Sequence, residues 1–311
     1  MSGNSSHDLT ISSVYHTTAT KELLEFNLLL TKKMNPGADF AWVVADNSLG
    51  KVPANDRDSG FIIVPGEAKA EGLSSWMRGS YHHAAGIHKT LEHIKTRFAL
   101  ILDSDFFLVR PAWIADVIEH MLEEKLHFFG TPYHPARLIK YRYFSSINCF
   151  FIDLHRVDYR ELDFRPGYND TFGGRSFLQR VNKRVRQFAQ NTILGERAKI
   201  RISRDTGYRI SKHFSQSARF DLAKPVFKPK HPISFLEKIL PDRFSYAPKK
   251  PGYYSETSFA ELGYPDAASF GWEEYVWRGR PFAVHLNANR NKERRNIKDE
   301  LAVIGKLFPV S

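Results

Sequence analysis

The first half of the chain alternates short apolar runs with stretches in which apolar residues recur at helical spacing. The runs predict strands over 9–15, 40–45, 61–64, 98–102, 127–130 and 146–154. The helical spacing predicts helices over 20–34, 80–94 and 111–125. Strands that alternate with helices typically form a mixed, mostly parallel sheet that the helices flank, so we expect an α/β fold.

The second half has a less regular pattern. It predicts a helix over 206–214, a strand over 281–286 and a C-terminal helix ending in the apolar stretch 301–308. A Pro- and Lys-rich connection at 224–251 lies between the first two of these elements. We therefore expect a first domain over 1–225, with a basic insert at 175–212, and a C-terminal segment over 226–311.

Composition narrows the class of protein. The 311 residues are 42% hydrophobic and 25% charged, which is ordinary for a globular protein. No run of 18 apolar residues indicates a membrane span, and residues 1–10 lack the basic and apolar regions of a signal peptide, so we expect a cytoplasmic protein. The single cysteine, Cys149, excludes an internal disulfide and a cysteine-rich zinc site.

Two carboxylates stand directly after a continuous apolar strand. Asp103 and Asp105 follow the run FALIL at 98–102. Ligands of open α/β sheets bind beyond the carboxyl ends of strands, so these acids would face a crevice, either together or separated by a turn. Neighbouring carboxylates repel each other unless a cation relieves the repulsion, and oxygen ligands suit Mg²⁺ or Mn²⁺. The alternative is that both acids simply cap the next element.

The first strand has the polar end SVYHTT, the second ends in the acid of WVVADNS, and a helix then leads into the strand that ends in LDSD. This order of elements resembles that of the GT-A glycosyltransferases that use nucleotide sugars, similar to glycosyltransferase family 2. Asp103, Ser104 and Asp105 resemble their DxD motif, and the likeness covers roughly residues 9–155. It implies a GT-A (Rossmann-like) fold and an Mn²⁺- or Mg²⁺-dependent transfer of sugar from a nucleoside diphosphate sugar. The acceptor would be a hydroxyl of a glycan or lipid-linked molecule, in bacterial-type surface polysaccharide or glycoconjugate synthesis.

The resemblance also implies roles for residues at the strand ends. Asp105 would bind the metal, and Asp103 the metal or the ribose. The other implied donor contacts are Ser104, His16 and Thr17 beside the nucleotide, Asp46 at the base and Arg78 at the phosphates. Ala84 departs from the Asn-containing helix start of the family, and His82 and His83 read as ordinary helix-surface residues. Asp46 has an Asx turn as its alternative role.

Further site residues are expected downstream. Asp205 resembles the acid that serves as base in inverting enzymes, although Arg204 replaces the second acid often found there, and an N-cap role is the alternative. By the same resemblance His285 would complete the metal site, and Arg290 would meet the diphosphate. Trp272 and Glu273 are candidates for acceptor contact, and Glu273 and Glu274 compete with Asp205 as base.

The net charge of +11 predicts a polyanionic partner. Eleven basic residues and two acidic ones fall within 175–212, and segment 177–188 has an apolar helical face with basic residues largely off it. That segment could contact an anionic membrane at the inner face of the cytoplasmic membrane, bind an acidic acceptor, or pack on the sheet. The rival functions are a basic nucleic-acid-binding protein, for which no motif is present, and a haloacid-dehalogenase-like phosphatase, whose DxD lies near the chain start. We therefore expect no nucleic-acid partner.

Overall fold

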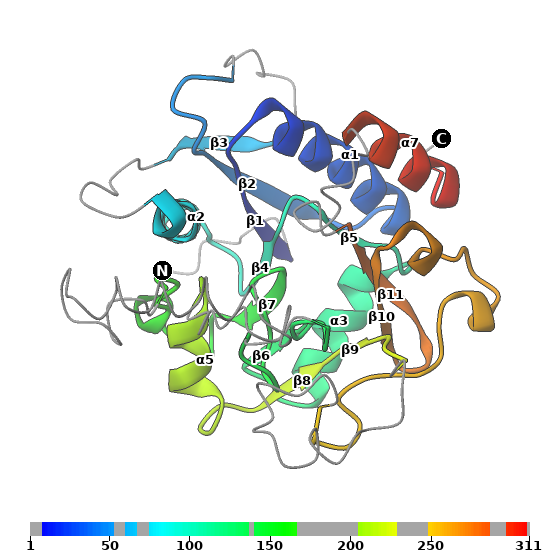
Figure 1. Cartoon of the computed structure of the whole chain (residues 1–311). Coiled ribbons are helices and arrows are strands. Elements are labelled where there is room, and N and C mark those ends of the chain that lie inside the picture. The colour runs from blue at the N-terminus through cyan, green and yellow to red at the C-terminus, as the bar shows by residue number, and fades with distance from the viewer. Residues whose placement is uncertain are drawn as a thin grey trace, which may run out of the picture.

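The computed structural model describes residues 8–52, 60–66, 75–136, 140–166, 205–228, 248–286 and 297–309. Seven strands form one mixed, mostly parallel sheet (Figure 1). In spatial order they are β3 (Ile62–Pro65), β2 (Phe40–Asp46), β1 (Leu9–Tyr15), β4 (Phe98–Leu102), β7 (Cys149–Asp153), β6 (Phe128–Gly130) and β8 (Phe220–Leu222). Of these strands, β7 alone runs antiparallel to its neighbours. The other six therefore end at the same side of the sheet, which we call the carboxyl edge.

The centre of the sheet is buried on both faces. β1 pairs with β2 on one side and β4 on the other, and all seven of its residues are buried. This burial explains why its sequence is not strictly alternating, since a central parallel strand faces helices on both sides. Its polar Ser13 is satisfied, because its hydroxyl donates to the carbonyl of Leu102 (2.7 Å) and accepts from Trp42 Nε1 (3.0 Å).

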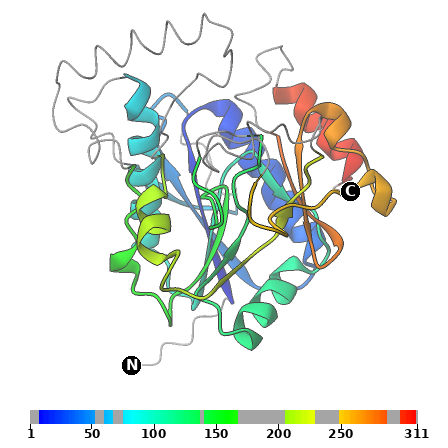
Figure 2. The same ribbon diagram turned by 60° about the horizontal axis from the view of Figure 1, so that its bottom comes forward.

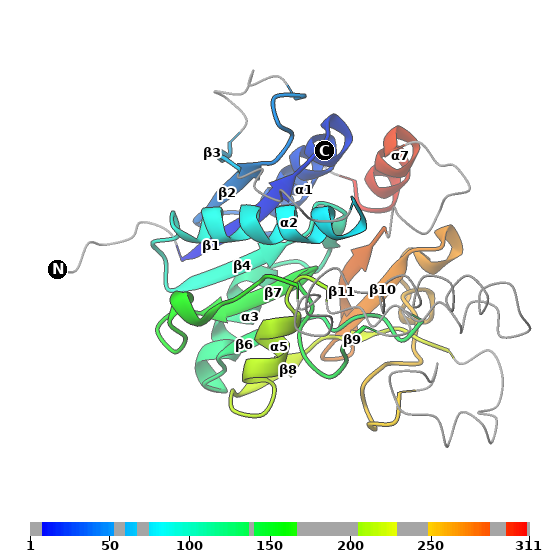
Figure 3. The same ribbon diagram turned by 60° about the vertical axis from the view of Figure 1, so that its left-hand side comes forward.

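Helices cover both faces of this sheet (Figures 2 and 3). α2 (Ser75–Leu91) and α5 (Tyr208–Phe214) pack on one face, where Ala84, Ile87 and Phe214 enter the core. α1 (Thr18–Met34) and α3 (Trp113–Glu123) pack on the other face, and α7 (Ile297–Leu307) lies beside α1. Short 3₁₀ turns cover 159–161, 260–262 and 268–270.

A second sheet of four antiparallel strands joins the two halves of the chain. In spatial order it contains β5 (Phe106–Leu108), β11 (Arg280–His285), β10 (Glu273–Trp277) and β9 (Lys224–Pro225). Asn27 of α1 anchors β5, because its amide donates to the buried carbonyl of Phe106 (2.8 Å). The boundary expected near residue 225 falls in β9, which pairs with β10. The described strands after residue 225, β10 and β11, therefore share a sheet with β5.

The predicted elements are confirmed with shifted ends. The helix expected at 80–94 spans Ser75–Leu91, and the strand expected at 146–154 spans Cys149–Asp153. β5, β8, β9 and β10 were not predicted. The first three have only two or three residues each, and β10 begins with two acids that are buried. None of the described helices is both long and apolar enough to cross a bilayer.

We expect Gly130→Ala to destabilise the protein by about 1–3 kcal/mol, since inserted methyl groups in packed interiors force backbone shifts. A Cβ at Gly130 would lie 2.2 Å from the carbonyl oxygen of Cys149 on the adjacent strand. Gly305→Ala in α7 is the control, since its Cβ would meet Phe26 at an ordinary 3.5 Å and should stabilise the helix by about 0.5–1 kcal/mol. Urea unfolding followed by circular dichroism measures both; equal stability of Gly130→Ala and wild type would contradict the close packing of β6 on β7.

Candidate active site

The turn between β4 and β5 carries the carboxylates of Asp103 and Asp105, and we call Asp103, Ser104 and Asp105 the DxD turn. The N–H of Asp103 donates to the carbonyl of Asn148 (3.0 Å), and the N–H of Phe106 donates to the carbonyl of Asp103 (3.1 Å). Asp103, Ser104 and Asp105 are all partly exposed at the carboxyl edge. The chain turns here instead of continuing as a strand, so the two acids have different neighbours.

Asp105 faces a histidine of the second sheet. His285 is the last residue of β11 and pairs with Phe106, and the N–H of Leu286 donates to the carbonyl of Asp105 (3.0 Å). His285 Nε2 lies 3.4 Å from Asp105 Oδ1, and the His285 side chain is 4% exposed. The structure thus brings together two of the three residues predicted as metal ligands, although they are 180 positions apart in the chain.

A buried glutamate contacts the other side of the His285 ring. Glu273 Oε2 lies 2.7 Å from His285 Nδ1 and accepts the hydroxyl of Tyr275 at 3.3 Å. A carboxylate at Nδ1 favours the tautomer in which Nδ1 carries the proton and Nε2 is the acceptor. Nε2 is the ring atom that faces Asp105.

The Asp105–His285 pair has the geometry of two ligands of one cation. In the tautomer that Glu273 favours, both facing atoms are acceptors, so a cation between them would relieve their repulsion. Two ligands about 2.1 Å from one ion at a right angle lie about 3 Å apart, near the observed spacing. Within the described ranges no three acidic, histidine or cysteine side chains converge on one point. The pair therefore suits an ion that takes its remaining ligands from a bound phosphate or water.

Asp103 has a partner on α2 that the sequence did not predict. His83 Nε2 lies 3.2 Å from Asp103 Oδ1, in contrast to the ordinary surface role expected for His83. Burial disfavours the charged form of the imidazole, but the carboxylates of Asp103, Asp205 and Asp105 outweigh it and raise the pKa of His83. All three acids therefore act on one histidine, which places Asp205 in the same electrostatic environment as the DxD motif.

Asp205 is held by three donors. Ser80 Oγ donates to Oδ1 (2.6 Å), the N–H of Thr206 also donates to Oδ1 (2.9 Å), and the Lys140 ammonium pairs with Oδ2. Burial opposes the charge of this carboxylate, yet Lys140 and the hydrogen bonds hold the pKa of Asp205 well below its usual range. The alternative N-cap role is wrong, because α5 begins at Tyr208 with Gly207 at the N-cap and no side-chain cap.

Helix α2 links the acids. Ser80 and His83 are three residues apart, so they lie on the same side of the helix. One contacts Asp205 and the other contacts Asp103. The spacing of these two polar residues, on the helix that precedes β4, was the signal in the sequence that could have identified them as partners of the acids. No local pattern identified Lys140 as a partner of Asp205.

The predicted donor contacts at the ends of β1 and β2 lie at the carboxyl edge and also have local roles. The hydroxyl of Thr17 caps α1 by accepting the N–H of Thr20 (3.2 Å). Asp46 Oδ1 accepts the N–H of Ser48 (2.8 Å), which is the alternative Asx turn. Burial, followed by the nearby imidazoles of His83 and His82, lowers the pKa of His16 to about 4, so His16 is neutral at pH 7.

The acceptor role expected for Trp272 is wrong. Its side chain is buried with 3% exposure, and its Nε1 donates to Glu300 of α7 (2.7 Å). The ring therefore packs between the second sheet and α7, with no face for a sugar. Glu273 is also buried, and its carboxylate contacts His285 instead of an acceptor.

Several predicted residues fall outside the described part of the chain. Residue 78 lies in α2, but its side chain is outside the description. Arg290, the whole of 177–188 and most of the basic insert at 175–212 lie outside the described residues altogether. The donor role of Arg78 and Arg290 and the membrane role of 177–188 remain predictions.

Comparisons with known proteins give distant likenesses. No family model and no curated protein matches the chain. Among solved structures it is similar to the galactosyltransferase LgtC, at 18% identity and a TM-score of 0.34 over 49% of this chain and 62% of that one. It is also similar to S. aureus TarS 1–349 (13%, 0.34, 50% of each chain) and to a glycosyltransferase involved in the glycosylation of the major capsid of PBCV-1 (12%, 0.33, 69% and 81%). All three TM-scores are below 0.5.

Proposed function

We propose that the protein is a metal-dependent glycosyltransferase that moves a sugar from a nucleoside diphosphate sugar to a hydroxyl of a glycan or lipid-linked acceptor. The observation that carries the proposal is the Asp105–His285 pair, formed where the two sheets meet at the carboxyl edge. When bound there, Mn²⁺ or Mg²⁺ would neutralise charge on the departing diphosphate. Ligands of open α/β sheets bind at this edge, which supports a nucleotide there.

The donor would lie along the ends of β1, β2 and β4. Asp103, kept in place by His83, is suited to accept a hydrogen bond from the ribose. Asp46 and the neutral imidazole of His16 lie at the same edge, where they would contact the nucleotide. Thr17 and Ser104 have hydroxyls at the corresponding strand ends. Arg78 and Arg290 complete the proposed donor contacts by meeting the phosphates.

An inverting transfer needs a base at the acceptor hydroxyl, and we assign that role to Asp205. Its carboxylate is ionised at neutral pH, as a base requires, but its low pKa makes it a weak one while Lys140 is bound. An acceptor hydroxyl that displaced Lys140 from Oδ2 would raise the basicity of the carboxylate. Lys140 thus tunes Asp205 without touching the reacting atoms.

Glu273 acts as a positioning residue in this proposal. It lies against His285 Nδ1, so it directs Nε2 toward Asp105 and toward the proposed ion. Its burial strengthens the contact, because the surrounding dielectric is low. This role replaces the acceptor contact expected from the sequence.

We expect Asp105→Asn and His285→Ala each to lower Mn²⁺-dependent turnover of the donor by roughly 100-fold or more, since each removes one proposed ligand. A thermal-shift screen of nucleoside diphosphate sugars with Mn²⁺ identifies the donor first, because a bound ligand stabilises the folded state by mass action. His93→Ala, an exposed histidine just after α2, is the control. Full Mn²⁺-dependent turnover in either variant would remove that residue from the site.

We expect Asp205→Asn to lower sugar transfer by about 10²–10⁴-fold while Mn²⁺-dependent donor binding persists, as loss of a general base does. Lys140→Met should retain transfer and move the acid limb of the pH–rate profile to higher pH, because it removes the cation that depresses the pKa of Asp205.

The stability of the same variants gives a second readout. A depressed carboxylate pKa stabilises the fold above the unfolded pKa of about 3.9, and this contribution is lost as the pH falls toward the folded value. Asp205→Asn should therefore lose less stability on acidification than wild type. If Lys140→Met and Asp205→Asn abolish transfer equally, Asp205 is an anchor for Lys140 and not a base.

We expect the Nδ1–H tautomer of His285 in ¹⁵N NMR spectra of the metal-free protein, because Glu273 accepts that proton. Glu273→Leu should shift the ring toward the Nε2–H tautomer and weaken Mn²⁺ binding by about 10–100-fold in calorimetry. Glu273→Gln keeps an uncharged oxygen acceptor, so we expect Mn²⁺ affinity between those of wild type and Glu273→Leu. Glu119→Leu, which changes an exposed residue of α3, is the control. A wild-type spectrum with the Nε2–H tautomer would overturn this role.

A further inference from the structure

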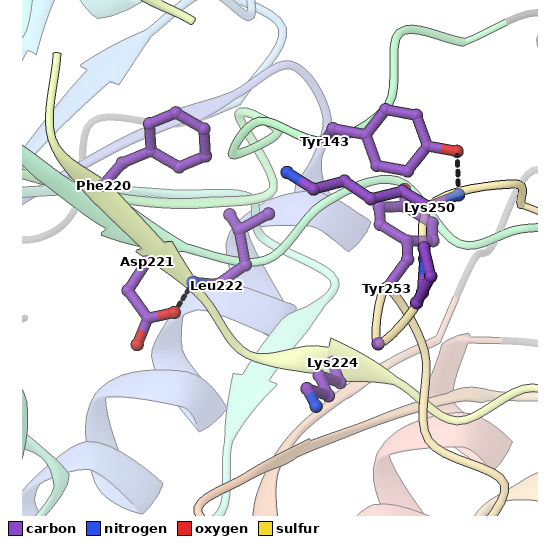
Figure 4. A pocket seen from close by; sticks show the side chains of 9 residues that line it. Tyr143, Phe220, Asp221, Leu222, Lys224, Lys250 and Tyr253 are labelled. Carbon is purple, nitrogen blue, oxygen red and sulfur yellow. Dashed lines mark hydrogen bonds between the residues drawn. The ribbon is translucent and has the colours of Figure 1, made fainter.

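A cavity of about 190 Å³ lies beside β8, away from the residues assigned above (Figure 4). Residues from β8, β9, the Tyr143 loop and the segment 250–253 line it. Its wall combines aromatic rings with two lysines: Tyr143, Phe220, Tyr253, Lys224 and Lys250. This combination of ring faces and cations has no part in donor binding as proposed.

The cavity and the DxD turn lie at different points of the same carboxyl edge. Leu102 of β4 pairs with Cys149 of β7, Gly130 of β6 pairs with the next residue of β7, and Gly130 also pairs with Leu222 of β8. Leu222 lines the cavity. At about 4.8 Å per strand, three strand steps place the cavity roughly 14 Å from the end of β4. An acceptor that reacts near Asp103 and Asp105 could therefore extend along the edge into it.

Packed tyrosines connect the cavity wall with Asp205. The hydroxyl of Tyr253 donates to the carbonyl of Tyr133 (2.6 Å), and the ring of Tyr133 packs edge-on against Tyr141 at 5.0 Å. Burial, together with the charge of Asp205, raises the pKa of Tyr141. The wall of the cavity and the proposed base thus belong to one continuous packed region.

In the part of the chain that the structure describes, no carboxylate pairs with either lysine of the cavity wall. Neither Lys224 nor Lys250 forms an ion pair with a carboxylate among the described residues. The acid in the wall, Asp221, is engaged by His120 (2.8 Å) and by the N–H of Leu222 (2.8 Å). The Lys224 ammonium lies close to Gly252, where a Cβ would meet it at 3.8 Å.

Tyr143 is held in a strained conformation at this wall. Its φ is 63°, in the left-handed region that a bulky residue rarely adopts. Its hydroxyl accepts the N–H groups of Lys249 (3.1 Å) and Lys250 (3.2 Å), and the Lys250 ammonium lies 5.8 Å from its ring. Backbone strain of this kind clusters at ligand sites. The two hydrogen bonds hold the backbone of Lys250 at the Tyr143 hydroxyl.

We propose that this cavity binds an acidic sugar unit of the acceptor, whose carboxylate or phosphate is held by Lys224 and Lys250 while its ring lies on the aromatic wall. The inference rests on the proposed function and specifies its acceptor as an anionic glycan. An anion beside two ammonium groups gains the attraction between opposite charges in addition to hydrogen bonds, whereas a neutral sugar gains only the hydrogen bonds. The cavity would thereby select acidic acceptors over neutral ones.

NMR titration of the full chain with glucuronate, glucose 6-phosphate and glucose tests the proposal. We expect at least one anionic probe to bind at least tenfold more tightly than glucose, with affinity falling as salt is added. The comparison between glucuronate and glucose 6-phosphate distinguishes a carboxylate from a phosphate. The double variant Lys224→Gln/Lys250→Gln should lose at least tenfold in affinity for the anion, and Lys95→Gln, an exposed lysine just ahead of β4, should lose none.

Tyr143→Phe keeps the ring and removes the hydroxyl that accepts the two N–H groups, so it should weaken anion binding less than the double variant does. Equal binding of glucose and both anions, or unchanged anion binding by the double variant, would overturn the proposal. The donor thermal shift with Mn²⁺ is measured on the same samples. Donor binding without anion selectivity overturns the cavity proposal alone, whereas anion selectivity without any donor binding overturns the proposed transferase and leaves an acidic-sugar site.

Discussion

The pairing of β5 with β11 is the constraint on which the candidate site depends. Three residues separate the end of β4 from the start of β5, so the chain leaves the large sheet and enters the second one within the DxD turn. The register opposes His285 to Phe106, and a slip of one residue would turn the imidazole to the other face. Asn27 of α1 anchors β5 from the other side. The position of His285 is thus fixed by backbone pairing before any ligand binds.

Around this junction, two of the three acids face a basic side chain. Asp103 faces His83 and Asp205 pairs with Lys140, whereas Asp105 faces the acceptor nitrogen of His285 in the tautomer that Glu273 favours. Three carboxylates in one region would repel one another in a medium of low dielectric without such partners. The pairing has a consequence for catalysis, because a substrate must compete with a partner that is already present. Lys140 at Asp205 is the clearest case, since its ammonium occupies the oxygen that an acceptor hydroxyl would need.

The sequence predicted the large sheet and the place of the DxD turn because both depend on local patterns. A continuous apolar run such as 98–102 is typical of a strand buried on both faces of a parallel sheet, so the acids that follow it lie at the edge of that sheet. The proximity of His285 to Asp105 came from family resemblance, since no local pattern encodes a contact across 180 residues. Trp272 was misassigned for the same reason: an aromatic beside two acids looks exposed, yet its partner Glu300 lies in a distant helix. His83 and Lys140 were missed because their partners are set by tertiary packing alone.

The net charge of +11 takes on a different meaning once pairing is known. Lys140 and Arg209 are basic residues near the site, but Asp205 and Asp163 neutralise them at short range. A paired cation has a weak field at a distance, so it adds to the net charge without attracting a polyanion. Lys224 and Lys250 differ, because both line a cavity and neither forms an ion pair with a carboxylate among the described residues. Among the described residues, Lys224 and Lys250 at the β8 end of the carboxyl edge therefore combine positive charge with a cavity that an anionic partner could enter.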